Sequence, residues 1–394
     1  MAVAYDPFAE EVMRDPHPVY ARLRVEAPCY HVEKWDCWAL SRFDDIWAAS
    51  MDAENYSTAQ GTTAAHLLTK IQPVTPMLNL MDPPQHTKLR AQIRKYFMPA
   101  RVNALQPQIQ QFVEEAFAPA LEKGEADLYN EVGQRISVKV ACLANGFPVE
   151  DADMLNELVK RFFGREEGVE GMTQDGVASM MEMTAYFAEL IKKRRDNPSK
   201  DGSAVDTVLQ IELDGRKMSD EEAGSHLSMF LIGGAETFPK VLSSAVYLLY
   251  KHPDQRAECA KDPSLLPDAF TEVLRHDMPT QFLCRTLRAD VALHGETMRK
   301  GRPVLFLYPS ANRDESEFEN PDVFDIHRRP PRILSFGHGI HACIGAHFAR
   351  MEGKLSLEHL LGHAPEYEID ESGLERIRTE FVQGWATMPA RLTA

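Results

Sequence analysis

The chain has 394 residues, of which 59 are acidic and 43 are basic, so its formal net charge is −16. With 44% hydrophobic and 26% charged residues it has an ordinary globular composition, which excludes collagen-like and low-complexity classes. The acidic balance argues against a nucleic-acid-binding protein, which needs a basic face, and against adsorption to anionic membranes.

The N-terminal residues lack the basic and apolar regions of a signal peptide, so we expect a cytoplasmic protein. The longest apolar run, 227–235, is far shorter than the ~20 residues that cross a bilayer. No repeat and no Gly/Ser or Pro linker divides the sequence, so we expect one domain over residues 1–394. The six cysteines form no C-x-x-C pair, and most of them are expected to be buried small side chains.

Short strands are the first elements predicted along the chain, at 30–32 and 38–40, from alternating apolar and polar residues. A helix follows, opened by Asp82 as a capping side chain ahead of two prolines. We expect it to run to Phe97 and to stop at Pro99.

Helical periodicity dominates the middle of the chain, most clearly at 180–191. The Gly-rich acidic stretch 164–176 before it predicts a solvated surface loop, with a mobile lid over a pocket as the alternative. Asp214 and Gly215 indicate a hairpin turn, and a further strand is expected at 304–307. The predicted class is mainly α with a minor β part.

The most informative segment is 336–345 (FGHGIHACIG), followed by a predicted helix over 346–361. Its glycines predict a tight loop that delivers Cys343 to a helix N-terminus, where the helix dipole and free N–H groups favour the thiolate. Such a thiolate is either a nucleophile or a metal ligand. A nucleophile needs an oriented base, and His341 cannot easily fold back onto Cys343. As a sole protein ligand the thiolate suits haem iron. A buried structural cysteine is the plain alternative, but the clustered glycines imply that another group approaches the backbone closely.

This segment resembles the haem-binding signature of the cytochrome P-450 superfamily, F-x-x-G-x-x-x-C-x-G. Phe336, Gly339, Cys343 and Gly345 match it without a gap. The resemblance implies a mainly α fold in which haem lies between a distal helix and the helix after the cysteine loop, with Cys343 as the ligand of the iron.

A second match is the E-x-x-R helix, where the i, i+3 spacing puts Glu272 and Arg275 on one helical face. Arg328 matches the arginine that completes a structural network in the family.

A third match is the acid–alcohol pair Glu236 and Thr237, which in the family delivers protons on the distal face of the haem. Two glycines precede it inside an apolar helical run, at a cost of ~1 kcal/mol each, which suggests that something approaches the backbone there. Pro239 removes a helical hydrogen bond, so we expect a bent turn near Thr237. A kinked core helix is the alternative.

The haem propionates need cationic partners. By resemblance these are His86 and Arg90, which are i, i+4 neighbours, together with Arg285 and His341. The other residues that the resemblance places against the cofactor are Gly234, Ala235, Phe336, Gly337, Ile344 and Gly345.

The resemblance implies a haem b monooxygenase that uses O2 to hydroxylate, O-dealkylate or epoxidise a small to medium hydrophobic compound, such as a terpenoid, steroid or aromatic. Its substrate pocket is expected, by position, at His66, Leu67, Leu68, Met229, Ile232, Gly233, Gln281, Phe282, Leu283, Phe381 and Val382.

Electrons must come from another protein, since the sequence has no flavin, nicotinamide or iron–sulfur motif. We expect a ferredoxin or flavodoxin with its own reductase. No acidic residue lies between Asp325 and Glu352, whereas Arg328, Arg329, Arg332 and Arg350 are basic. This predicts a positive proximal surface for an acidic partner, unless the arginines are used internally.

Three alternatives remain open at this point: a peroxide-driven peroxygenase on the same fold, a non-catalytic haem-thiolate binding or sensing protein, and, more distantly, a haem-free cysteine enzyme. Retention of Glu236 and Thr237 favours oxygen activation.

Overall fold

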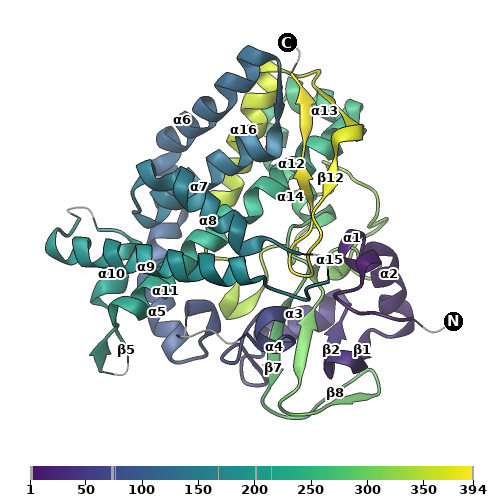
Figure 1. The fold of residues 1–394 in the computed structure, drawn as a ribbon. Helices are drawn as coiled ribbons and strands as arrows, with labels where there is room; N and C mark the ends of the chain where they lie inside the picture. Colours follow the sequence, from purple (N-terminus) through teal and green to yellow (C-terminus); the bar gives the residue numbers. More distant parts are fainter. Residues whose placement is uncertain are drawn as a thin grey trace.

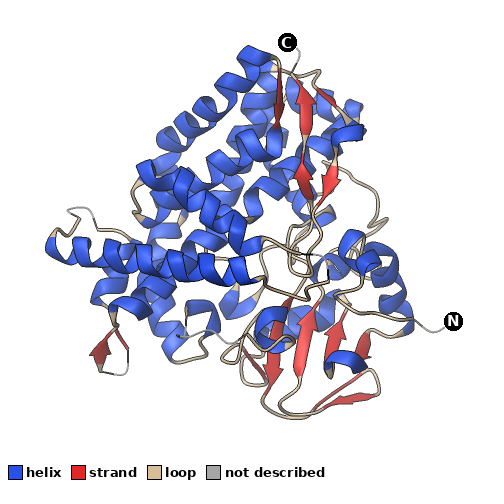
Figure 2. Cartoon of the chain, in the orientation of Figure 1, coloured by secondary structure: helices blue, strands red, loops and turns tan. Residues whose placement is uncertain are grey.

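The computed structural model describes residues 3–71, 75, 77–166, 168–199, 202–213 and 215–392. Helices form most of the molecule, and short strands gather at one side and in a C-terminal hairpin (Figure 2). The predicted class, mainly α with small sheets, is confirmed. The α-helices are α1 (Glu10–Arg14), α2 (His17–Glu26), α3 (Phe43–Met51), α4 (Ala64–Leu67), α5 (Gln85–Ile93), α6 (Pro99–Lys123), α7 (Gln134–Asn145), α8 (Ala152–Phe163), α9 (Gln174–Asp196), α10 (Ala204–Gln210), α11 (Asp220–Ala235), α12 (Thr237–Lys251), α13 (Pro253–Lys261), α14 (Leu266–His276), α15 (Tyr308–Ala311) and α16 (Ala346–His363).

The largest sheet has the strand order β1-β2-β10-β7-β3 and lies near the N-terminal helices (Figure 1). Its strands are β1 (Cys29–Val32), β2 (Cys37–Leu40), β10 (Pro303–Phe306), β7 (Leu283–Leu287) and β3 (Tyr56–Ser57). The three strands predicted from alternation are therefore present within one residue of their expected ends. Parallel pairing of β10 with β2 and antiparallel pairing with β7 joins an N-terminal strand to strands from much later in the chain.

The remaining strands form small pairs and a three-stranded sheet. They are β4 (Glu125–Asp127), β5 (Glu212–Leu213), β6 (Arg216–Lys217), β8 (Val291–Leu293), β9 (Glu296–Met298), β11 (Glu368–Ile369), β12 (Glu375–Arg376), β13 (Trp385–Thr387) and β14 (Pro389–Arg391). The hairpin predicted at Asp214 and Gly215 is formed by β5 and β6, although Asp214 itself lies outside the described residues.

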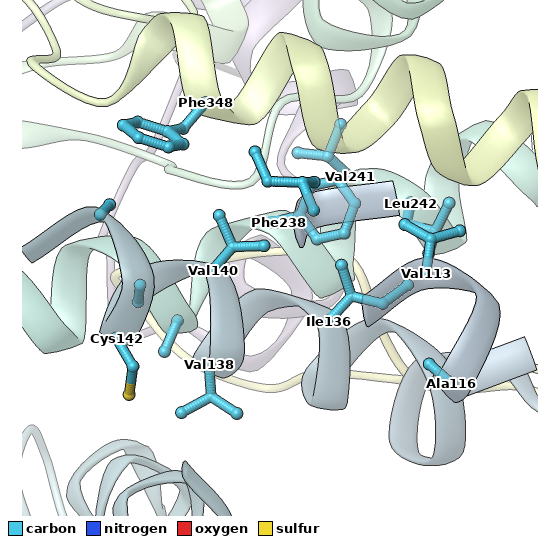
Figure 3. Packing of buried hydrophobic residues seen from close by; sticks show 14 of the residues in the cluster. Val113, Ala116, Ile136, Val138, Val140, Cys142, Phe238, Val241, Leu242 and Phe348 are labelled. Carbon is cyan, nitrogen blue, oxygen red and sulfur yellow. The ribbon is translucent and has the colours of Figure 1, made fainter. Parts of the chain in front are cut away.

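The helical core is built from apolar stripes that face one another. Ile136 and Val140 of α7 pack beside Phe238 and Val241 of α12, and Phe348 of α16 lies across from them (Figure 3). Burial of these side chains supplies the hydrophobic free energy that fixes the helices around the cavity described below. No described helix is long and apolar enough to cross a membrane.

Two helical expectations need correction. The segment predicted as one helix up to Phe97 is α5 followed by a 3-10 turn, η3 (Arg94–Phe97), and Pro99 begins α6 rather than ending a helix. Asp82 does not cap α5, whose first residue follows Pro84. Its carboxylate instead accepts hydrogen bonds from the backbone N–H of Thr58 (2.9 Å) and the hydroxyl of Ser57 (2.5 Å).

The stretch 164–176 is partly a connection and partly helix. It links α8, which ends at Phe163, to α9, which begins at Gln174. The loop therefore ends before Gln174, whereas the sequence predicted a loop up to residue 176. Thr173 caps α9 by accepting a hydrogen bond from the N–H of Gly176. The long helix predicted over 180–191 lies inside α9.

Candidate functional site: a cavity between Cys343 and the α11–α12 break

The cysteine loop is held in place by its own backbone and by α3. The N–H of Cys343 donates to the carbonyl of Phe336 at 2.7 Å, and His338 stacks on Trp47 with ring centroids 3.5 Å apart. Gly339 has φ +71°, and a Cβ on it would lie 2.1 Å from the carbonyl oxygen of Ser50. The sequence predicted that another group approaches these glycines closely. At Gly339 that group is the backbone of α3.

Cys343 differs from the other five cysteines, because it is exposed while they are buried. It lies two residues before Gly345, the residue that precedes α16. The surrounding protein raises the pKa of its thiol, whereas hydrogen bonds from the N–H groups of Gly345 and Ala346 and the charge of Arg90 lower it. The helix N-terminus thus acts on the pKa in the predicted direction, and desolvation by the protein that surrounds the cavity opposes it.

Cys343 faces a cavity of about 370 Å³. The end of α11 and the start of α12 form another part of its wall, where Gly233, Gly234, Glu236 and Thr237 line it. The helix is interrupted at Glu236, between the last residue of α11 and the first of α12. This interruption is the bend predicted from Pro239, which cannot donate a helical hydrogen bond.

Four basic side chains from three segments line this cavity: His86 and Arg90 from α5, Arg285 from β7, and His341 from the cysteine loop. The rings of His86 and His341 lie 4.2 Å apart. Burial, with the charge of Arg90, lowers the pKa of His86 to about 4, and burial, with the charges of Arg285, His86 and Arg90, lowers that of His341 to about 2. Within the described ranges neither arginine has an ion pair. Arg90 donates a hydrogen bond to the backbone carbonyl of Ala342, and Arg285 donates one to that of Cys284.

Glu236 has a partner that the sequence did not suggest. Lys240, one turn later in α12, forms an ion pair with its carboxylate, and the Lys240 side chain is fully buried. The ammonium also donates to the hydroxyl of Tyr129 at 3.2 Å, from the π-helical segment η4 (Leu128–Gly133). A lysine four residues after a glutamate is common on solvated helices, so only its burial marks it out.

The Glu272–Arg275–Arg328 contacts are present as predicted. Arg275 donates to the Glu272 carboxylate at 2.7 and 2.8 Å with both side chains fully buried, and Arg328 donates to the same carboxylate at 3.1 Å. Arg275 also donates to the carbonyls of Asn312 and Pro321. This network ties α14 to the segment that leads into the cysteine loop.

The structure divides the predicted pocket residues into two groups. The cavity lining includes Met229, Ile232, Gly233, Leu283 and Phe381. Outside that lining lie His66, Leu67, Leu68, Gln281, Phe282 and Val382.

Gln281 shows why some predicted residues lie outside the lining. Its position in the sequence suggested a polar contact with the substrate. Its side chain accepts a hydrogen bond from Tyr20 at 3.3 Å and donates to the carbonyl of Thr379 at 2.9 Å. It therefore holds the chain ends together. His66 accepts a hydrogen bond from the N–H of Thr62 at 3.3 Å, and Thr62 itself lines the cavity.

Of the residues expected to contact the cofactor, Phe336, Gly337, Gly234, Ile344 and Gly345 line the cavity. Ala235 does not. It is buried against α7, where the hydroxyl of Ser137 donates to its carbonyl at 3.0 Å.

Several lining residues carry no motif and were missed, among them Asn79, Phe97, Thr280, Phe348 and Glu352. Glu352 is the most unusual of them, because it is buried and one carboxylate oxygen has no partner in the described part of the chain. Burial raises the pKa of this carboxyl well above its usual range.

The stretch between Asp325 and Glu352 contains no acidic residue, but three of its four arginines form ion pairs with acids elsewhere in the chain. Arg328 is used by Glu272, Arg329 pairs with Asp268 at 2.7 Å, and Arg332 pairs with Glu317 at 2.6 Å. The charge pattern of the sequence failed here because the partner acids come from other segments. Arg350 lies over the ring of Phe336, and its pKa is lowered by burial and raised by Cys343.

The model of the cytochrome P-450 family matches residues 169–371 of this sequence. The chain belongs to the cytochrome P-450 family. The putative cytochrome P-450 123 of Mycobacterium tuberculosis is 34% identical over 392 residues, covering 99% of this chain and 97% of that protein. Vitamin D(3) 25-hydroxylase of Pseudonocardia autotrophica is 32% identical, covering 98% and 96%.

The P-450 fold is equally clear from solved structures. CYP109E1 from Bacillus megaterium, solved in complex with testosterone, superposes with a TM-score of 0.88 at 27% identity, covering 98% of this chain and 100% of that one. Family membership implies a monooxygenase that carries haem.

The cavity of this P-450 fits that cofactor. A Cβ on Gly233 would meet nothing within 4 Å, so the α11 wall of the cavity leaves open space for a bound group. Both ring nitrogens of His86 are buried without a partner in the described structure, and two unpaired arginines lie at the same edge. Two arginines without a carboxylate partner, beside two histidines that can donate N–H hydrogen bonds, suit a group with two propionates.

Proposed function

We propose that this protein is a haem b monooxygenase that uses O2 to hydroxylate a small to medium neutral hydrophobic compound, with electrons from a ferredoxin or flavodoxin and its reductase. The observation that carries the proposal is that Cys343 and the Glu236–Thr237 break line one and the same cavity. The cytoplasmic location expected from the sequence belongs to the same proposal.

In this proposal the cofactor, when bound, supplies the iron at which O2 is reduced. Cys343 ligates that iron, and His86, Arg90, Arg285 and His341 hold the propionates. Glu236 and Thr237 form the proton path. The Thr237 hydroxyl has no protein hydrogen-bond partner among the described residues and borders the cavity, so it is placed to hold a proton donor there.

The chemistry of the lining supports a neutral, mainly apolar substrate. Met229, Ile232, Leu283 and Phe381 present hydrocarbon surface to the cavity. The basic lining residues lie at the edge assigned to the propionates, which leaves no cation for a substrate carboxylate within the described lining. Asn79 and Thr280 can each offer one polar contact.

The names of two similar proteins support a steroid-like skeleton as the first class to test. One is a vitamin D(3) 25-hydroxylase and the other was solved with testosterone. We therefore rank steroids and secosteroids ahead of terpenoids and smaller aromatics.

The electron donor is proposed to bind on the side of the cysteine loop away from the cavity. Arg94 and Arg350 are exposed and have no ion pair in the described ranges. The charge of Arg350 interacts with Cys343, and that of Arg94 with Arg90. We therefore assign the contact with an acidic partner to Arg94 and Arg350, and no longer to Arg328, Arg329 and Arg332.

The test is a screen of the haem-loaded enzyme with steroids, secosteroids, terpenoids and aromatics for a change in iron spin state, followed by turnover. A compound that shifts the spin state and yields a hydroxylated product with NADH, reductase and ferredoxin supports the proposal. Turnover with hydrogen peroxide alone would make the protein a peroxygenase. No spin-state change and no turnover across all classes would indicate a binding or sensing protein.

A further inference from the structure

Lys240, Glu236 and Tyr129 form a buried polar cluster at the edge of the cavity. The Lys240 side chain is 0% exposed and that of Glu236 is 8% exposed. The ammonium contacts the Glu236 carboxylate, donates to the Glu236 carbonyl at 3.1 Å and donates to the Tyr129 hydroxyl at 3.2 Å. An ammonium group has three N–H donors, so each finds an acceptor. A buried ammonium is tolerated only when it is paired in this way.

The position of Lys240 is fixed by two other segments. The Tyr129 ring, from η4, lies 5.4 Å from the ammonium, which gives a cation–π contact in addition to the hydrogen bond. On another side, the C-terminal chain passes so close that a Cβ on Gly384 would lie 3.1 Å from the Lys240 Cβ. The lysine therefore has little freedom to leave its carboxylate.

Lys240 is not part of the cavity lining, whereas Glu236 and Thr237 are. Any influence of Lys240 on chemistry in the cavity must therefore pass through Glu236. In the described structure the carboxylate is engaged by Lys240.

Burial raises the pKa of the Glu236 carboxyl, and Lys240 offsets part of that increase. Burial alone would lower the pKa of Lys240, but the carboxylate and Tyr129 outweigh it and raise the pKa. The other charge near Glu236 is Arg165, just after α8, which also favours the carboxylate. Arg165 is itself paired with Glu380 at 3.2 Å, so Lys240 is the direct partner.

We propose that Lys240 is a positioning residue for proton delivery, which keeps the Glu236 carboxylate ionised and oriented at the cavity edge. The inference rests on the proposed monooxygenase function. A proton from water binds a Glu236 carboxylate oxygen and then passes to the Thr237 hydroxyl oxygen, while the hydroxyl releases its own proton into the cavity. Lys240 keeps its three protons throughout. Glu236 returns to the carboxylate when it passes its proton on, the charge of Lys240 favours that form, and Tyr129 holds the ammonium in place.

The first experiment needs no substrate. Infrared spectra of the haem-loaded wild type, Lys240→Met, Lys240→Arg and the double variant Glu236→Gln/Lys240→Met are recorded against pH. We expect Lys240→Met to gain a protonated-carboxyl band that the double variant lacks. The midpoint of that band should lie at least about one pH unit above that of the wild type, and Lys240→Arg should stay near the wild type.

The second experiment uses the compound that gives the largest spin-state change in the screen above. Product formed per NADH should fall with decreasing pH as Glu236 takes up a proton, and this fall should begin at higher pH in Lys240→Met. The midpoint of the fall should rise by at least about one pH unit in Lys240→Met, in step with the carboxyl band in the infrared titration. In a Glu236→Gln background, Lys240→Met should have no further effect.

Tyr129→Phe provides a milder variant, because it removes the hydroxyl acceptor and keeps the ring over the ammonium. We expect a smaller shift in the same direction. The proposal is overturned if Lys240→Met shows no Glu236-dependent carboxyl band, or if its loss of coupling persists unchanged in the Glu236→Gln background. Failure of the wild type to form product would instead overturn the proposed function.

Discussion

Arg90 donates a hydrogen bond from its guanidinium to the carbonyl oxygen of Ala342, the residue directly before Cys343. This contact joins α5 to the cysteine loop. The same side chain borders the cavity, at the edge where two histidines and a second arginine also lie. The residues proposed to hold the propionates and the residue proposed to ligate the iron are thus linked through one side chain.

Replacing Arg90 with Ala should weaken haem binding, because it removes both a charged partner and this link. A hydrogen bond to a charged group is worth about 1.5–3 kcal/mol, so we expect haem affinity to fall by at least about tenfold. The measurement is the haem-to-protein ratio after competition with apomyoglobin. Lys88→Ala, on the exposed face of the same helix, is the matched control and should keep its haem. Equal retention by both variants would contradict the assignment.

Replacing Glu272 with Gln should destabilise the fold, because Arg275 would keep a buried charge without a carboxylate. Breaking such a buried pair costs about 3–5 kcal/mol. The check is a denaturant titration followed by circular dichroism. Asp268→Asn breaks the more exposed pair with Arg329 and should change stability by less than about 1 kcal/mol. Similar losses in the two variants would show that the Glu272 network is not structural.

Thr237→Ala should leave substrate binding intact and divert electrons to hydrogen peroxide, because the hydroxyl that guides the proton is lost. The readouts are the spin-state titration and the peroxide released per NADH consumed. Thr280→Ala removes a hydroxyl from another part of the cavity lining and should not raise the peroxide yield. Normal product per electron in Thr237→Ala would remove this residue from the proton path.

Charge reversal at Arg94 should slow reduction by ferredoxin and weaken its dependence on ionic strength. Opposite charges steer association, and salt screens them over about 8–10 Å at physiological ionic strength. Stopped-flow reduction rates at several salt concentrations measure both effects. Lys193→Glu makes the same change on an exposed position of α9 and should leave the rate unchanged. A wild-type rate that does not vary with salt would refute steering.

The sequence predicted the contacts of the Glu272 network and the tight cysteine loop because local motifs carry them, whereas six of the eleven pocket residues expected by position lie outside the cavity lining. The E-x-x-R spacing and the cysteine loop each specify contacts within a few residues. Pro239 likewise predicts the break at Glu236, because the missing N–H is a property of that residue alone.

What the sequence did not predict depends on contacts between distant segments. Gly339 is required by the carbonyl of Ser50, and the Arg332 charge is neutralised by Asp44 and Glu317 from remote positions. Lys240 has an unremarkable i, i+4 spacing to Glu236, and its importance comes from burial beside Tyr129. Such contacts can be identified only when the three-dimensional fold is known.

In the proposed reaction, the cavity lined by Cys343 and Thr237 is where one oxygen atom from O2 enters a hydrophobic substrate. The most direct measurement is turnover of the best spin-shifting compound under ¹⁸O2, with NADH, reductase and ferredoxin, and mass spectrometry of the product. We expect one ¹⁸O atom in the product of the wild type and no labelled product from a Cys343→Ala control. An unlabelled product, or turnover that requires only hydrogen peroxide, would contradict it.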